Sequence, residues 1–364
     1  MLQNKYVLIT GAVIGALAVT LMAMGNPPNM GMCVACFVRD IAGALGLHRA
    51  EAVQYLRPEI PGFILGAFII SVLAGEFRAR GGSAPLTRFF IGFFVMIGAL
   101  VFLGCPLRMV LRLAAGDLNA LVGFLGFAAG IYAGLQWLKN GFSLGRSYKL
   151  AKGNGYLLPL FAVALIIFAL ISPSFIFHSA KGPGSMSAPF IVSLAVGLLV
   201  GILAQRSRLC MAGGLRDIFL FGDFHLFSGF IAIFVVALVL NVILGNFQLG
   251  FTGQPIAHSD GIWNFLGMFL VGYGAVLLGG CPLRQTILAG EGDTDAAVTF
   301  LGMLLGAAFS HNFGLASSAE GATAGGKIAV LIGIIVLTGI AYLNIAKSLS
   351  SNTKKEANIN VSAN

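Results

Sequence analysis

The sequence predicts an all-α integral membrane protein composed of two related halves. Of its 364 residues, 58% are hydrophobic and only 10% are charged, which leaves too little polar surface for a water-soluble globular protein. The segment Gly-Cys-Pro-Leu-Arg at 104–108 occurs again at 280–284, which indicates an internal duplication. Because long alternating strands are absent, a β-barrel is not expected.

Ten apolar segments approach the roughly 20 residues that a helix needs to cross a bilayer. No small-residue cleavage site follows the first segment, so we expect a membrane span there and not a signal peptide. Five spans in each half would reverse the second half relative to the first, so we expect inverted repeats, an architecture associated with transporters. We place the spans at 6–24, 60–76, 87–104, 118–138, 155–172, 189–205, 227–245, 261–279, 295–312 and 326–346.

The duplication extends beyond the two pentapeptides. At an offset of 177, Cys33 corresponds to Cys210, and Arg39-Asp40 corresponds to Arg216-Asp217. At an offset of 176, further matches follow the pentapeptides, at Gly116, Asp117, Val122, Phe124, Leu125, Gly126 and Gly130. Two motif blocks in register are not expected by chance.

The predicted domains are a first repeat at 1–175, a second repeat at 176–348 and a polar, disordered tail at 349–364. If the N-terminus is cytoplasmic, the inner segments hold fifteen Lys and Arg residues and the outer segments hold seven. The excess of positive charge on the inside predicts that both termini are cytoplasmic. The cysteine motifs of the first repeat then face outward, and those of the second repeat face inward.

The cysteines lie on segments that are too short to span a membrane, at 31–46, 104–116, 208–222 and 280–292. Each segment could be a surface loop or a short re-entrant helix. Irregular backbone at membrane depth requires protein or a water-filled cavity around it. We favour re-entrant helices for the two Cys-Pro segments and leave both alternatives open for the other two.

The pentapeptide has the chemistry of an anion and thiolate site. Proline suits the first position of a helix, which would place Cys105 and Cys281 at helix starts, facing unpaired N–H groups. Such a position attracts anions and lowers the pKa of a thiol, and Arg108 and Arg284 would strengthen both effects. An arginine on a short helix can also simply extend to the membrane interface.

Cys33 and Cys210 are further candidates because they occupy equivalent positions in the two repeats. A single cysteine in a membrane helix usually fills space, but retention in both repeats favours thiol chemistry. Cys36 lacks this support, since its equivalent is Gly213.

Several polar residues have a structural interpretation beside the functional one. Arg39-Asp40 and Arg216-Asp217 more often tether a loop than bind substrate. His48 and its equivalent His225 fit the membrane interface. The repeated glycines at 126, 130 and 134 indicate close helix packing.

Other function classes are disfavoured. The net charge of +9 fits cytoplasmic loops and not nucleic-acid binding. Five cysteines cannot all pair within one chain, and one Cys-x-x-Cys without a second pair makes no zinc ribbon. We therefore expect no metal site and no cofactor. No P-loop is present to couple transport to ATP.

Residues 31–40 (Gly-Met-Cys-Val-Ala-Cys-Phe-Val-Arg-Asp), with Gly-Cys-Pro at 104–106 and 280–282, resemble the YeeE/YedE family of bacterial inner-membrane proteins. The chain is most similar to the YedE branch, described as selenium transporters. The resemblance implies an hourglass of two inverted repeats with short helices meeting at its waist. It also implies thiosulfate-like transport by a cysteine relay, with Cys105 and Cys281 at the waist and Cys33 or Cys210 as an approach site.

We therefore hypothesise a transporter that takes up a small inorganic sulfur or selenium anion, with membrane lipid and a cytoplasmic sulfur or selenium carrier protein as partners. Substrate binding is assigned to Cys105, Cys281, Cys33, Cys210, Arg108, Arg284 and Cys36. The chain is not expected to be an enzyme. The alternatives are a membrane thiol oxidoreductase or sulfurtransferase that uses Cys33 and Cys36, and a structural membrane protein in which no cysteine matters.

Overall fold

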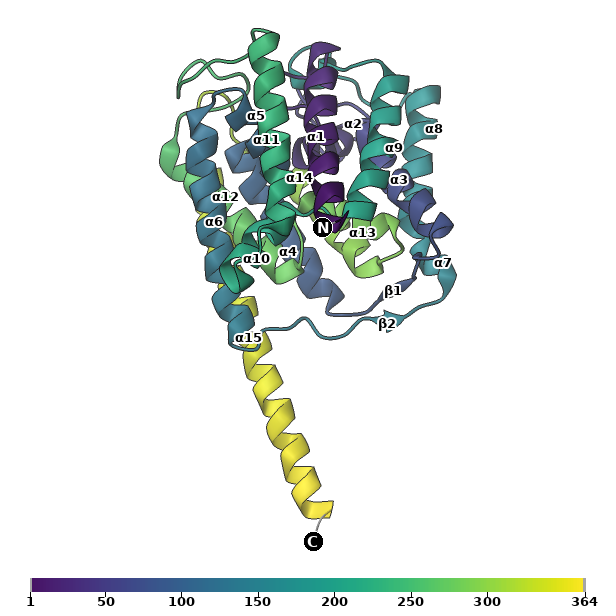
Figure 1. Ribbon diagram of the computed structural model, residues 1–364, viewed down its shortest axis with the longest axis vertical. Coiled ribbons are helices and arrows are strands. Elements are labelled where there is room, and N and C mark those ends of the chain that lie inside the picture. Colours follow the sequence, from purple (N-terminus) through teal and green to yellow (C-terminus); the bar gives the residue numbers. More distant parts are fainter. Residues whose placement is uncertain (1, 363–364) are drawn as a thin grey trace.

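The computed structural model describes the backbone of residues 2–362 and the side chains of residues 5–345 (Figure 1). It is a helical bundle with one short antiparallel ribbon, in which Arg80 pairs with Lys149 and Gly81 with Tyr148. In chain order the elements are α1 (Leu2–Ala23), α2 (Val34–Ala44), α3 (Glu59–Leu73), β1 (Arg80–Gly81), α4 (Pro85–Phe102), α5 (Pro106–Ala114), α6 (Leu118–Lys139), β2 (Tyr148–Lys149), α7 (Lys152–Gly155), α8 (Leu157–Ile171), the 3-10 turn Pro183–Ser185, α9 (Phe190–Ser207), α10 (Met211–Phe221), α11 (His225–Ile243), α12 (Gly261–Leu278), α13 (Pro282–Gly290), α14 (Thr294–Asn312) and α15 (Ala324–Ser362).

The chain is a multi-pass membrane protein. By length and composition, seven helical stretches within the described residues can cross a membrane. They lie at 5–23, 85–114, 118–139, 190–221, 225–243, 261–290 and 324–345. Large apolar side chains such as Leu73, Ile171 and Ile262 are more than two-thirds exposed, as expected for a surface that faces lipid.

Three of the ten predicted spans are helices that do not belong to these seven. Both α3 and α8 have 15 residues, which gives a length of about 22 Å, short of a typical hydrocarbon core. The third, α14, carries Asp295 and His311 near its ends, so its apolar part is shorter than its 19 residues.

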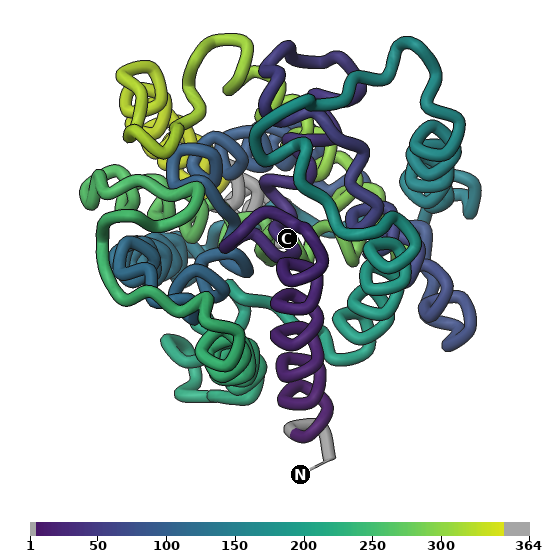
Figure 2. The backbone as a smooth tube through the Cα atoms, turned by 90° about the horizontal axis from the view of Figure 1, so that it is seen from above, coloured from purple at the N-terminus to yellow at the C-terminus, as the bar shows by residue number. Residues whose placement is uncertain are grey.

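Long helices pair with partners that are distant in the sequence. Packing joins α1 to α11, α3 to α9, α4 to α14 and α6 to α12. In the last pair, a Cβ at Gly126 or Gly130 of α6 would overlap the carbonyl oxygens of Phe265 and Phe269 on α12, so only glycine permits this approach. Figure 2 shows the bundle from above, where green helices from the later part of the chain lie beside purple and blue helices from the earlier part.

Four short helices of 9 to 11 residues, α2, α5, α10 and α13, lie among the long ones. Every residue of α2 is buried. Figure 1 places α2 and α5 toward one end of the bundle and α10 and α13 toward the other. The short helices thus bring the cysteine motifs into the protein interior.

The segment predicted to be a disordered tail, 349–364, is helical as far as it is described, because α15 continues to Ser362. Residues 349–362 contain no proline or glycine, and Ala, Lys and Glu are good helix formers. Residues 363–364 lie outside the described part.

Candidate functional site

The structure places four cysteines at helix starts. Cys105 and Cys281 are the N-cap residues of α5 and α13, with proline at the first helical position. Cys33 and Cys210 hold the same place before α2 and α10. Their Sγ atoms accept hydrogen bonds from the backbone N–H three residues later, at 3.3 and 3.2 Å. Each sulfur therefore lies at a helix start, where N–H groups without an intrahelical partner favour negative charge.

The sulfur atoms form two groups. The Sγ of Cys33 lies 2.9 Å from that of Cys36 and 3.8 Å from that of Cys105. The Sγ atoms of Cys210 and Cys281 are 4.0 Å apart. All five residues are free thiols. A soft ligand can therefore contact two thiols at once within either group.

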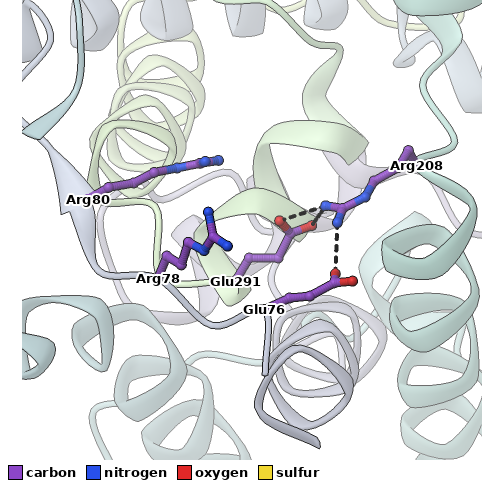
Figure 3. Close-up of a pocket in the computed structure, with 5 residues that line it drawn as sticks. All are labelled: Glu76, Arg78, Arg80, Arg208 and Glu291. Atoms are coloured by element: carbon purple, nitrogen blue, oxygen red, sulfur yellow. Dashed lines mark hydrogen bonds and ion pairs between the residues drawn. The ribbon is translucent and has the colours of Figure 1, made fainter. Parts of the chain in front are cut away.

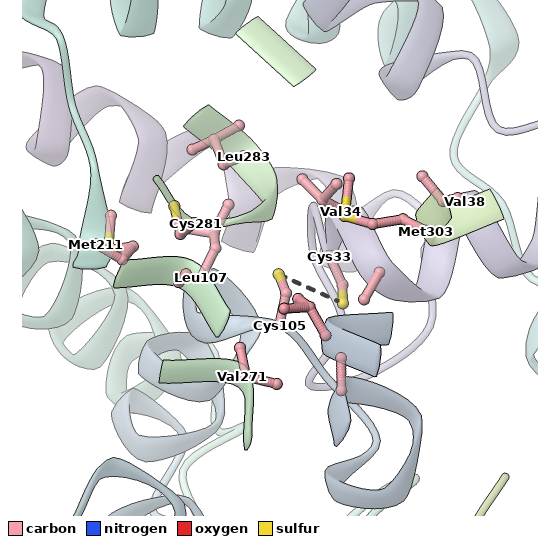
Figure 4. Close-up of a cluster of buried hydrophobic side chains, with 14 of the residues drawn as sticks. Cys33, Val34, Val38, Cys105, Leu107, Met211, Val271, Cys281, Leu283 and Met303 are labelled. Atoms are coloured by element: carbon pink, nitrogen blue, oxygen red, sulfur yellow. Dashed lines mark hydrogen bonds between the residues drawn. The ribbon is translucent and has the colours of Figure 1, made fainter. Parts of the chain in front are cut away.

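Apolar side chains enclose both groups. Cys210, at 6% exposure, is the most accessible of the five cysteines. Figure 4 shows Cys33, Cys105 and Cys281 within a cluster that includes Leu107 and Met303. In this conformation the thiols are closed off from water, so a polar ligand can reach them only after some of these side chains move.

Arg108 is a fully buried arginine without a carboxylate partner among the described residues. Its Nε and Nη2 donate to the carbonyls of Asn29 and Ile256, both at 2.9 Å. Its Nη1 donates to the carbonyl of Leu103 and, at 3.4 Å, to the Sγ of Cys36. A buried guanidinium that lacks an acidic partner favours a negative charge nearby. The first sulfur group is thus prepared for an anion or a thiolate.

The equivalent arginine of the second pentapeptide is neutralised. Arg284 Nη1 donates to Glu291 Oε1 at 3.0 Å, and Arg208 Nη1 donates to the same carboxylate at 3.0 Å. Glu291 corresponds to Ala115 at the offset of 176. The two copies of the motif therefore differ in charge balance, one having a cysteine beside its arginine and the other a carboxylate.

The Arg39-Asp40 pair is a tether. Arg39 Nη2 and Arg57 Nε each donate to a different oxygen of Asp40 at 2.7 Å. Arg57 also donates to the carbonyls of Met186 and Pro183, so it ties α2 to the segment that joins α8 and α9. Arg57 was not singled out from the sequence, although an arginine three residues before the predicted span at 60–76 was a usable signal.

His48 is also internal. It is 1% exposed, and its Nε2 lies 3.0 Å from the carbonyl oxygen of Arg39, so it is not a membrane-interface residue. Burial lowers the pKa of its imidazole, which keeps the ring neutral at physiological pH.

Charged residues line a cavity of about 250 Å³ beside Arg284 (Figure 3), namely Glu76, Arg78, Arg80, Arg208 and Glu291. Arg208 links the two carboxylates, since its Nη2 donates to Glu76 at 2.7 Å. A hydrogen bond from Gln205, followed by the charges of Arg208 and Arg206, lowers the pKa of Glu76. None of these residues was a predicted site residue. Glu76, Arg78 and Arg80 lie on the segment between α3 and α4. Arg208 follows α9 and Glu291 follows α13, so sequence spacing gave no signal that these three segments meet.

The structure is that of a multi-pass membrane protein whose cysteines lie in two enclosed groups. Residues 206–362, less than half of the chain, match the family described as Sulphur transport.

Two curated relatives are similar to the chain. Thiosulfate transporter TsuA of Spirochaeta thermophila is 38% identical over 112 residues, which are 30% of this chain and 33% of the relative. Thiosulfate transporter TsuA of Escherichia coli is 29% identical over 108 residues, which are 29% of this chain and 30% of the relative. The matches span about a third of either relative's length. They support the resemblance to a transporter family, and their names refer to thiosulfate and do not single out a selenium branch.

Proposed function

We propose that the chain takes up a small inorganic sulfur anion of the thiosulfate type through a pathway lined by Cys33, Cys105, Cys210 and Cys281. The observation that carries this proposal is that each repeat brings its own two cysteines together in the same way. The Sγ atoms of Cys33 and Cys105 are 3.8 Å apart, and those of Cys210 and Cys281 are 4.0 Å apart. Polarisable thiols can hydrogen-bond weakly to a soft anion. Weak sites in series let an anion pass without being trapped.

The surrounding charges support an anionic substrate. Arg108 contributes a buried positive charge without a carboxylate partner, and four helix N-termini add partial positive charge. Both compensate for the water that an anion loses on leaving solution. Selenium oxyanions share this chemistry, so they are a second substrate class. The names of the relatives favour sulfur.

We further propose two inverted repeats, at 1–175 and 176–348. The helix pairs support this architecture, because exchanging equivalent helices converts α1–α11 into α9–α3 and α4–α14 into α12–α6. The glycine contacts follow the same rule, since Gly302 and Gly306 approach Phe89 and Phe93 as Gly126 and Gly130 approach their partners. The short helices would then be re-entrant, in a bacterial inner membrane with both termini in the cytoplasm.

The test is uptake of radiolabelled thiosulfate into proteoliposomes. Losing one thiol contact of about 1 kcal/mol in each of Cys105→Ala and Cys281→Ala should slow uptake by about fivefold or more. Cys105→Ser and Cys281→Ser, which keep a hydrogen-bond donor, should retain more activity than the alanine variants. Undiminished uptake in both alanine variants would exclude the thiol pathway. Competition by sulfite, sulfate, selenite and selenide then ranks the substrates.

A second candidate function is a membrane thiol oxidoreductase or sulfurtransferase. The specific observation that favours it is the 2.9 Å separation of the Cys33 and Cys36 sulfurs. Cys36→Ser separates the two functions, because a dithiol centre needs both thiols. If this variant still transports while Cys281→Ala does not, the dithiol function is excluded.

A further inference from the structure

The cavity beside Arg284 has the composition of a binding site for a small anion. Three arginines and two glutamates line it, and Figure 3 shows the ends of Arg78, Arg80 and Arg208 directed into the same space as the Glu291 carboxylate. Its volume of about 250 Å³ is ample for a small hydrated anion, since roughly 10–15 Å³ suffices for one water.

The chain connects this cavity directly to the second sulfur group. Arg284 lies in the first turn of α13, which begins after Cys281, and Glu291 is the residue at the end of the same helix. Arg208 precedes Cys210 by two residues and has a φ of +56°, a backbone conformation that is unfavourable for any residue with a side chain. This backbone directs Arg208 onto Glu291 and Glu76.

The Glu291 carboxylate binds two guanidinium groups that an anion could bind in its place. Its side chain is 7% exposed, and its two oxygens accept from Arg208 and Arg284 at 3.0 Å. A dianion that entered the cavity would compete with this carboxylate for both guanidinium groups.

Arg78 differs from the other arginines of the cavity. Arg80 is paired with Asp293 at 2.8 Å, and Arg208 is paired with Glu76. Within the described part of the chain, the guanidinium of Arg78 has no carboxylate partner. It is therefore available to a ligand without breaking an ion pair.

We propose that this cavity is an anion-binding vestibule at the Cys281 end of the pathway. It takes small dianions of sulfur. Arg78 attracts the anion. Before the anion binds, Glu291 holds Arg208 and Arg284. The anion then replaces the Glu291 carboxylate on these two guanidinium groups, and the return of the carboxylate releases the anion. The inference rests on the proposed function, because it assigns the vestibule to the transported anion.

The experiment measures thiosulfate and sulfate binding to the purified full chain in detergent by calorimetry, and thiosulfate uptake in proteoliposomes. Arg78→Gln should weaken binding about tenfold, the scale of one exposed charge-assisted hydrogen bond, and raise KM. Glu291→Gln should tighten binding about tenfold and lower both KM and the maximal rate, because release slows. Arg146→Gln, an exposed arginine outside the cavity, is the matched control and should change neither quantity.

Binding and uptake equal to wild type in both Arg78→Gln and Glu291→Gln would overturn the vestibule. Arg78 is exposed, so its variant remains informative if Glu291→Gln fails to fold. The two proposals fail separately. Absence of thiosulfate uptake by the wild-type chain contradicts the proposed function, whereas the binding measurements decide the vestibule.

Discussion

Arg112 lies on α5 near the first sulfur group and forms a buried ion pair with Asp117. Its Nε donates to Asp117 Oδ2 at 2.6 Å, and both side chains are fully buried. Its Nη1 donates to the carbonyl of Phe102 at 2.8 Å, and its guanidinium carbon lies 4.3 Å from the centre of the Phe102 ring. Asp117 also accepts from the N–H of Asn119 and so caps α6.

Arg112→Met should destabilise the protein, because it leaves the Asp117 carboxylate buried without its cation. Breaking a buried pair from one side costs about 3–5 kcal/mol. Thermal unfolding in detergent measures the change. The matched control is Arg216→Met, whose pair with Asp217 is partly exposed and should contribute only about 0–1 kcal/mol. Equal melting temperatures for the two variants would contradict this account.

At the residue scale, the sequence repeat identified the cysteines as candidate site residues, but it did not identify the charged residues around them. The pentapeptide placed Cys105 and Cys281 at helix starts because proline and glycine act locally. Glu291 could not be found this way, since its equivalent is Ala115. Arg112 likewise corresponds to Leu288. A residue without an identical counterpart in the other repeat cannot be identified by comparing the two repeats, and its partners are set by tertiary packing.

At the scale of elements, glycine determines how closely the long helices approach. A Cβ at Gly302 of α14 would overlap the carbonyl oxygen of Phe89 on α4, as one at Gly126 of α6 would overlap that of Phe265 on α12. These contacts let backbones meet directly, which replaces the hydrophobic driving force that is absent between helices in lipid.

Gly126→Leu and Gly302→Leu should therefore lower the melting temperature. Overpacking typically costs about 1–3 kcal/mol, and here the obstacle is backbone, which cannot move aside as a side chain can. Gly339→Leu on α15 is the control, because nothing lies within 4 Å of its added Cβ. That variant should be neutral or slightly stabilising, since leucine has the higher helix propensity. A similar loss of stability at all three positions would refute the role of close approach.

Hydropathy predicted the positions of the long helices but not all of their lengths. It reported apolar runs at 60–76 and 155–172, whereas α3 ends at Leu73 and α8 starts at Leu157. Turns and polar contacts at the helix ends decide these boundaries, and hydropathy does not contain that information. The pattern at 126, 130 and 134 indicated close packing without identifying α12 as the partner.

At the scale of the whole molecule, the segments before and after residue 175 are interleaved. Helices α1, α3, α4 and α6 come from the earlier segment, and each packs on a helix of the later one. Neither segment can bury its glycine faces alone. The sequence predicted the duplication, but similar repeats can lie side by side or interleave, so pairing across the chain required the structure.

Co-expression of fragments 1–175 and 176–364 tests this interleaving. Together the fragments should co-purify as one complex, because four helix pairs join them. Expressed alone, each fragment should aggregate or be degraded, since the glycine faces remain uncovered. Gel filtration in detergent and protease resistance measure both results. A monodisperse, protease-resistant fragment 1–175 on its own would contradict interleaving.

The interleaved helix pairs also limit how the proposed transport can work. Moving the segment before residue 175 as one body against the segment after it would separate four helix pairs whose backbones touch, so the two segments do not act as two swinging lobes. The contacts group the long helices differently, because α1 and α3 pack with α9 and α11, whereas α4 and α6 pack with α12 and α14. The short helices contact both groups, so a change of access to the thiols would take place at the short helices.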